Sequence, residues 1–198
     1  MPHIRQAMIV ALFLGIAPAV IININYLIAA TEGYVPWCVP YWDSCTSISA
    51  TGREGTAFYF FKATMLPMAF VYFYYWKVAS QALAAEGYQG KAIVILGFVN
   101  VIALVSYTLA LGLAGDNFRL TRRIGIIFYF CSTYINQLLV LNQIYKLNLP
   151  DRTRQVQLGL CIAIISVGFL TLFLDILLDN YDDYEDAFEW VVALLVHI

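Results

Sequence analysis

The feature that most constrains this chain is a series of long apolar runs that carry almost no charge. The first, residues 7–30, has 24 residues and no Asp, Glu, Lys or Arg. About 20 helical residues at 1.5 Å each cross a hydrocarbon core of roughly 30 Å. Four more runs follow at about 57–76, 92–114, 124–145 and 156–178. We therefore expect an all-α, polytopic transmembrane helix bundle that forms a single domain over residues 1–198.

The composition excludes the main soluble classes. Apolar residues make up 62% of the chain and charged residues 12%, whereas a soluble domain has about 45–50% and about 25%. The surplus apolar surface needs lipid to cover it. The net charge is −2 and no basic run occurs, which excludes nucleic-acid binding.

A sixth apolar run, residues 187–198, is too short to cross. Its 12 residues give a helix of about 18 Å, where about 30 Å is needed. We expect an incomplete sixth span. Since a chain end in lipid is costly, we also expect the native chain to continue beyond Ile198.

The distribution of basic residues places the N-terminus in the cytoplasm. With that orientation, six Lys and Arg lie in the inner connections and four in the outer ones, as the positive-inside rule favours. The longest connection, residues 31–56, then lies outside. It contains Cys38 and Cys45, which are placed to form a disulfide in an oxidising compartment. No Cys or His spacing suggests a metal, and we expect no cofactor.

Ionisable residues inside spans are candidates for function because each is costly unless paired. Lys62, Asp175 and Glu189 fall at one depth, near the outer ends of their runs. We expect a cluster in which Lys62 bridges Asp175 or Glu189. Two interpretations stay open: a structural salt bridge or snorkelling lysine, and a polar pocket for a lipid head group.

The fourth run carries a polar residue every seven positions: Arg122, Tyr129, Asn136 and Gln143. This spacing keeps the polar residues on one helix face. They can form hydrogen bonds between helices, or one wall of a polar cavity that Asn23 and Asn25 of the first run help to line.

The outer loop holds a short polar stretch at residues 47–53. Ser47, Ser49, Thr51 and Arg53 offer hydroxyl groups and a guanidinium beside backbone N–H groups. This combination suits an anionic head group, although an ordered turn explains it as well.

Nothing in the sequence requires an enzyme. The loop serines lack a histidine within reach, because His3 and His197 lie elsewhere, and a nucleophile needs a nearby base. An intramembrane lipid acyltransferase or hydrolase, with Asp175 or Glu189 as the base and a loop serine as the nucleophile, is the alternative to a lipid-binding protein.

Three short motifs resemble one known family of six-span membrane proteins. They are residues 48–52 (Ile-Ser-Ala-Thr-Gly), the aromatic residues Phe128, Tyr129, Phe130 and Tyr134, and the pair Glu189-Trp190. The family groups the DRAM autophagy modulators, the Sfk-type plasma-membrane proteins and the factors that remodel the lipid of GPI anchors.

The sequence also departs from this family. Cys45-Thr46 replaces a proline that often precedes the first motif, and Arg122 or Arg123 stands where a histidine is common. The resemblance implies a lipid-related role, with membrane lipids as partners, and identifies no protein partner. It places the loop residues and Glu189 in a lipid-facing site, without catalytic roles.

Overall fold

The structure is a computed structural model that describes residues 2–147, 151–177 and 182–197. All regular secondary structure in these residues is helical. The elements are α1 (Pro2–Thr31), α2 (Pro40–Asp43), α3 (Ile48–Thr51), α4 (Gly55–Ala85), α5 (Ala92–Ala110), α6 (Asp116–Lys146), α7 (Asp151–Leu177) and α8 (Asp182–His197). Five of them, α1 and α4 to α7, are long and apolar enough to cross a membrane. The chain is a multi-span, all-α integral membrane protein, which confirms the predicted fold class at this level.

The helices do not begin and end at the same residues as the apolar runs. α4 and α6 have 31 residues each, or about 46 Å at 1.5 Å per residue, so they extend beyond a core of roughly 30 Å. Polar residues continue the helix there, because hydropathy marks the lipid boundary and not the helix end. α5 instead stops at Ala110, four residues before the expected 114, because Gly112 and Gly115 adopt positive φ angles of 75° and 113°.

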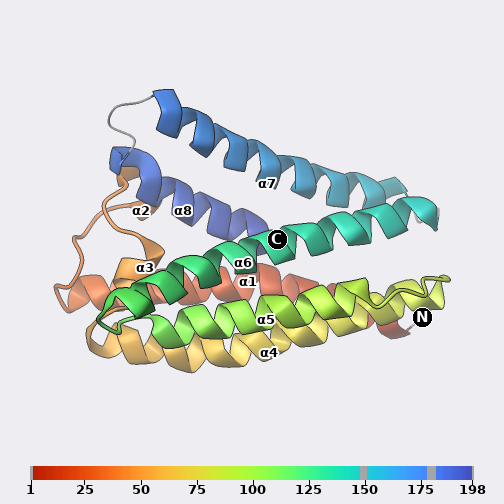
Figure 1. The fold of residues 1–198 in the computed structure, drawn as a ribbon, viewed down its shortest axis with the longest axis horizontal. Coiled ribbons are helices and arrows are strands. Elements are labelled where there is room, and N and C mark those ends of the chain that lie inside the picture. Colours follow the sequence, from red (N-terminus) through yellow and green to blue (C-terminus); the bar gives the residue numbers. More distant parts are fainter. Residues whose placement is uncertain (1, 148–150, 178–181, 198) are drawn as a thin grey trace.

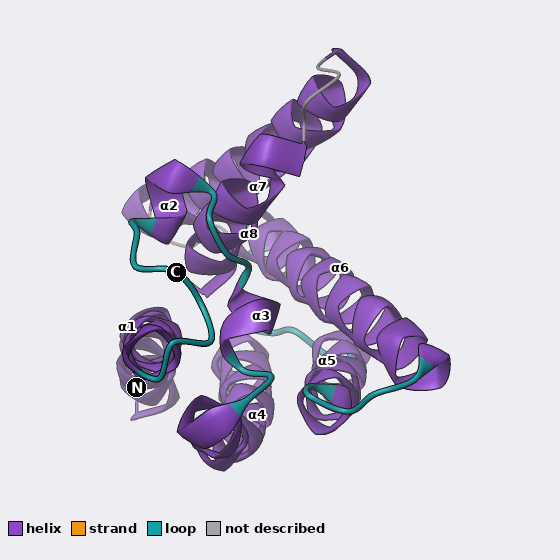
Figure 2. Ribbon diagram, turned by 90° about the vertical axis from the view of Figure 1, so that its left-hand side faces the viewer, coloured by secondary structure: helices purple, strands orange, loops and turns teal. Residues whose placement is uncertain are grey.

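The long helices lie roughly side by side along one axis (Figure 1). α1 packs on α4, α4 on α5, and α5 on α6, while α8 packs on α1, α2 and α7. Figure 2 shows α7 at the edge of this arrangement. Only 6% of the residues in its most apolar stretch, within Asp151–Thr171, are buried in the protein, the smallest share among the five long helices.

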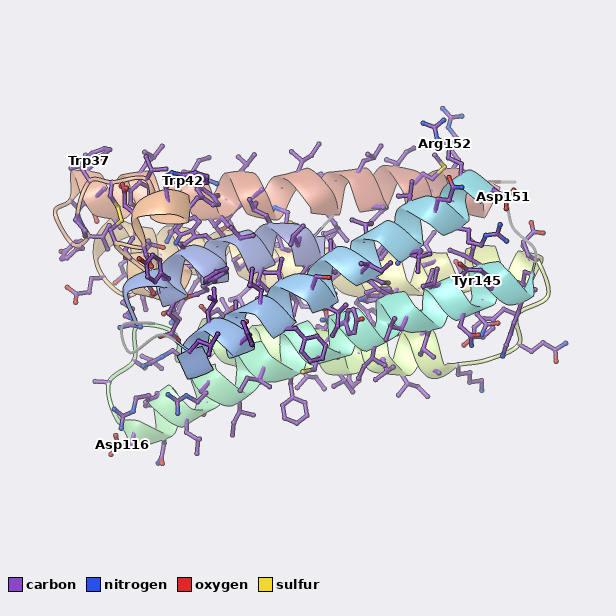
Figure 3. All side chains as sticks on the ribbon, turned by 90° about the horizontal axis from the view of Figure 1, so that it is seen from above. Trp37, Trp42, Asp116, Tyr145, Asp151 and Arg152 are labelled. Atoms are coloured by element: carbon purple, nitrogen blue, oxygen red, sulfur yellow. A yellow bond between two sulfur atoms is a disulfide. The ribbon has the colours of Figure 1, made fainter. Side chains whose placement is uncertain are left out.

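One end of the bundle carries a compact cap. We use the name cap for residues 32–54, which contain α2 and α3, together with the first turns of α8. Figure 3 shows Trp37 and Trp42 at this end, and Tyr145 and Arg152 at the opposite end. A disulfide joins Cys38 and Cys45, with 6.6 Å between their Cα atoms, and closes the turn around α2.

Buried amides join α5 to α6. Asn100 Nδ2 donates to the Tyr129 carbonyl at 3.1 Å and also to Thr133 Oγ1. Asn136 Nδ2 donates to the Ile93 carbonyl at 3.2 Å. These bonds fit the interpretation of the fourth run's polar residues as hydrogen-bonding contacts between helices.

Gly97 is required where α5 crosses α4. A Cβ atom at this position would lie 2.6 Å from Trp76 Cβ and 2.8 Å from two ring atoms of that side chain, and a Cβ atom cannot rotate away from its own backbone. Overpacking of this kind costs about 1–3 kcal/mol, more than the roughly 1 kcal/mol that Ala gains over Gly in a helix. We expect Gly97→Ala to lower the thermal unfolding temperature of the purified protein.

Gly159→Ala is the matched control. No atom lies within 4 Å of a Cβ built at Gly159 of α7, so only the gain in helix propensity remains and the unfolding temperature should stay equal or rise. Equal losses in the two variants would contradict the proposed close contact between α4 and α5.

Candidate functional site

Polar side chains from four separate regions of the chain meet where the cap joins the long helices. They are Ser49 of α3, Arg53 just before α4, Tyr107 of α5, Arg122 of α6 and Glu189 of α8. We call these five residues the cap site. Three of them, Ser49, Arg53 and Glu189, belong to the set predicted from the sequence.

α3 positions the serines and the arginine. Ser47 caps this helix, its Oγ accepting a hydrogen bond from the Ala50 N–H at 3.0 Å. Ser47 Oγ and Ser49 Oγ share a hydrogen bond of 3.1 Å, and Arg53 Nη2 donates to Ser49 Oγ at 2.8 Å. The predicted residues Ser47, Ser49 and Arg53 therefore lie together.

Thr51 points the other way and fixes α3 to α1. Its side chain is buried, and its Oγ1 accepts a hydrogen bond from Asn25 Nδ2 at 3.0 Å. Thr51 and Asn25 therefore form a structural contact below the cap site and are closed to a ligand.

Trp190 brings Glu189 to α3. The Trp190 side chain is fully buried and its Nε1 donates to the Thr46 carbonyl at 2.8 Å. Its ring packs edge-on against Tyr26 and Tyr41, with centroids 6.1 and 5.1 Å away. As a result the Ser49 backbone N–H donates to the Glu189 carboxylate.

Glu189 has an unusual protonation equilibrium. Burial, together with the neighbouring charges of Asp186 and Glu185, raises its pKa from 4.5 to about 7, while the Ser49 N–H and Arg53 act in the opposite direction. The pKa of Asp186 is also raised, chiefly by burial. Near neutral pH the Glu189 carboxyl can therefore act as a hydrogen-bond donor or as an anion.

Tyr107 and Arg122 complete the site. The sequence analysis did not select Tyr107, and it named Arg122 only as part of the polar stripe of the fourth run. Tyr107 is 5% exposed, and its hydroxyl lies within electrostatic reach of Glu189, Arg53 and Arg122. Arg122 Nη1 donates to the carbonyls of Ala110 and Leu113 at 3.0 and 2.9 Å. A tyrosine in an apolar run resembles an ordinary core residue, so no sequence signal marks Tyr107.

Lys62 lies outside the cap site. Its Nζ donates to the Leu109 carbonyl at 3.1 Å and lies 4.0 Å from the centroid of the Phe58 ring. Among the described residues the ion pairs are Arg119–Asp116 and Arg154–Asp151, so Lys62 and Glu189 are not paired. The side chain of Asp175, the other expected partner, falls outside the described residues.

The residues predicted to line one polar cavity lie in different helix contacts. Asn23 Nδ2 donates to the Tyr41 hydroxyl at 2.7 Å, and Asn25 bonds to α3. Tyr129 and Asn136 are buried between α5 and α6, and Gln143 is partly buried further along α6. The structure does not bring the five together.

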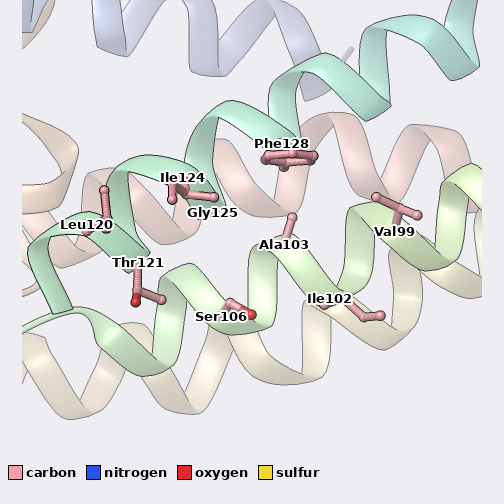
Figure 4. Close-up of a pocket in the computed structure, with 9 residues that line it drawn as sticks. All are labelled: Val99, Ile102, Ala103, Ser106, Leu120, Thr121, Ile124, Gly125 and Phe128. Carbon is pink, nitrogen blue, oxygen red and sulfur yellow. The ribbon is translucent and has the colours of Figure 1, made fainter. Parts of the chain in front are cut away.

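A hollow of about 310 Å³ lies between α5 and α6 (Figure 4). Its lining is mostly apolar, with the hydroxyls of Ser106 and Thr121 as exceptions. An acyl chain can fill such a groove, but no charged residue lines it, and the cap site residues do not contribute to it.

The geometry gives no nucleophile–base pair among the described residues. Glu189 receives the Ser49 backbone N–H, whereas Ser49 Oγ bonds to Arg53 and Ser47. The carboxylate of Asp43 accepts the Val39 N–H at 2.7 Å. In the described part of the chain no group of His, Cys, Asp and Glu could hold a metal ion.

The raised pKa of Glu189 predicts that the protein loses stability as the pH rises from about 4.5 to about 7. In this range the folded chain holds a proton that the unfolded chain has released, so the free energy of unfolding falls with rising pH and levels off above the folded pKa. We expect the thermal unfolding temperature to fall across this range, and to fall less in Glu189→Gln.

Asp116→Asn serves as a control, because the Asp116 side chain is 91% exposed and lies on the surface of α6. This variant should keep the pH dependence of the wild type. The assignment is wrong if Glu189→Gln and the wild type show the same slope.

Comparison with known proteins finds no match: no family model, no curated protein and no solved structure is similar to this chain. Its function has to be inferred from its own residues.

Proposed function

We propose that this integral membrane protein binds the polar head group of a lipid at the outer leaflet through the cap site. One observation carries the proposal. A guanidinium, hydroxyls, a backbone N–H and a carboxyl from α3, α5, α6 and α8 converge at one end of the bundle. That end is where the long helices leave the hydrocarbon, and lipid head groups occupy the same depth.

The exposed aromatic residues of the cap support this depth. Trp37 and Trp42 are 66% and 87% exposed although they are large and apolar, and tryptophan prefers the membrane–water interface. The disulfide and the Tyr41 contacts hold this turn in place. The cap therefore rests against the surface from which a lipid head group would enter.

The proposal includes an orientation and a sixth span. The cap is on the outer side, with the N-terminus in the cytoplasm, as the basic residues favour. The second half of α8 is the sixth membrane helix, and it runs from the cap into the bundle with Ala193 and Val196 buried.

The family resemblance enters here as part of the proposal. Residues 48–51 of the first motif form α3, and Glu189-Trp190 lies beside it. Two motifs that are about 140 residues apart in the chain are thus neighbours, which supports a lipid-related role like that of the DRAM, Sfk and GPI-remodelling proteins. The acyltransferase or hydrolase alternative has no such support, because Ser49 Oγ and Glu189 do not bond to each other.

Arg53→Gln should release a bound lipid. The exposed guanidinium is the cation of the site that is open to a phosphate, and charge-assisted hydrogen bonds to phosphate are about twice as strong as neutral ones. We expect the wild type, gently extracted and studied by native mass spectrometry with lipid analysis, to retain one class of phospholipid. The variant should lose most of it.

Arg152→Gln is the control, since Arg152 lies at the opposite end of the bundle (Figure 3). It should retain the lipid. The proposal fails if the wild type retains no class selectively, or if both variants lose lipid equally.

A further inference from the structure

The charges of the cap site are divided between its elements. The cations, Arg53 and Arg122, come from the start of α4 and from α6. The acid of the cap site, Glu189, comes from α8, and Glu185 and Asp186 lie beside it on the same helix. A ligand that enters between α3, α6 and α8 therefore meets positive charge on one side and negative charge on the other.

Ser49 keeps the opposite charges apart. Its Oγ accepts from Arg53, and its backbone N–H donates to Glu189. Arg53 and Glu189 are close enough to influence each other, but neither appears among the ion pairs of the described residues. A ligand with both charges can therefore bind each of them.

Tyr107 adds a hydroxyl to the positive side. The side chain is 5% exposed, and its hydroxyl lies within electrostatic reach of Glu189, Arg53 and Arg122. A tyrosine hydroxyl can donate and accept a hydrogen bond, so it can bind a group held between these charges.

The positive side suits a phosphate. Arg53 uses only Nη2 and Arg122 only Nη1 in hydrogen bonds within the described residues. The other N–H groups of each guanidinium can bind a ligand. Guanidinium groups bind phosphate with paired hydrogen bonds.

The negative side suits an ammonium group. Glu185 and Glu189 are four residues apart on α8, so they lie on one face, where like charges repel. Asp186 adds a third carboxyl beside Glu189. A primary ammonium carries three N–H donors and one positive charge, and it would relieve this repulsion.

We propose that the cap site binds a zwitterionic head group, a phosphodiester with a primary ammonium as in phosphatidylethanolamine. The phosphate lies at Arg53, Arg122 and Tyr107, and the ammonium lies at Glu189 and Asp186. This inference rests on the proposed function, because it specifies which head group the same site takes.

Competition between defined lipids tests the inference. The purified full chain is mixed with phosphatidylethanolamine, phosphatidylcholine and phosphatidylglycerol that carry the same acyl chains, and the bound lipid is measured by native mass spectrometry. We expect at least a fivefold preference for phosphatidylethanolamine over each of the others. Glu189→Gln combined with Asp186→Asn should remove the preference over phosphatidylglycerol, and Arg53→Gln should reduce binding of all three.

Two matched measurements keep the result interpretable. Asp151→Asn with Arg152→Gln, at the opposite end of the bundle, should leave the preference unchanged.

If the double acid variant does not fold, the preference of the wild type is measured from pH 5.5 to pH 8. The groups facing Glu189 are Arg53, Asp186, Glu185, Tyr107 and the Ser49 N–H. Protonation of Glu189 should lower the preference at acidic pH.

The outcomes separate the two proposals. Equal binding of phosphatidylglycerol and phosphatidylethanolamine, still lost in Arg53→Gln, would overturn the zwitterion and leave a simple phosphate site. Equal binding of phosphatidylcholine would overturn the requirement for a primary ammonium. Binding that no cap variant alters would overturn the proposed function itself.

Discussion

The hydrogen bond from Trp190 to the Thr46 carbonyl is the contact on which the cap depends. It joins positions 144 residues apart, and the indole that makes it is fully buried. An unpaired N–H at this depth would cost about 1–3 kcal/mol, and the ring packs on Tyr26 and Tyr41. This bond fixes α8 against the loop that leads into α3. The Ala187 N–H adds a second bond between α8 and this loop, to Ser44 Oγ at 3.1 Å. Together the two bonds bring Glu189 to Ser49.

The polar groups of this protein fall into two kinds. The amides of Asn100 and Asn136 donate to backbone carbonyls or hydroxyls of the neighbouring helix, and they are buried where the spans cross the hydrocarbon. These amides fix the packing of neighbouring helices and leave little room for a ligand. The groups of the cap site gather at one end of the bundle, where Arg53 is exposed and bonds only through Nη2 within the described residues. This division is the basis for proposing that a ligand binds at that end and not along the core.

From the sequence, the positions of the long helices are predicted well, whereas the directions in which their side chains point are predicted poorly. Apolar runs located all five long helices, because hydropathy directly measures the match to lipid. The sequence also predicted a depth for Lys62, but a depth does not specify the face of α4 from which the side chain extends. Lys62 bonds to the Leu109 carbonyl of α5 and lies apart from Glu189. The same limit applies to Tyr107, whose importance comes from the face of α5 that turns toward α3 and α8.

The loop residues of the site were predictable for a different reason. Ser47, Ser49 and Arg53 lie within one short segment, so their proximity is local and needs no knowledge of helix packing. Glu189 was chosen for its depth and for the resemblance at Glu189-Trp190, whereas its contact with Ser49 depends on the docking of α8. Arg122 was visible only as a member of a repeating stripe, since its bonds to Ala110 and Leu113 depend on how the chain turns between α5 and α6.

The cap is built to hold its site in one arrangement before any ligand arrives. The disulfide closes the turn that contains Tyr41, Tyr41 accepts a hydrogen bond from Asn23 of α1, and its ring packs on Trp190. Thr51 ties α3 to α1 from below through Asn25. A loop that becomes ordered only on binding loses entropy, which reduces affinity. In this cap the contacts above already order the loop when the protein folds. Arg53 is the exception, because its side chain is exposed on an ordered backbone. Under the proposed function it is therefore the residue that a head group would meet first.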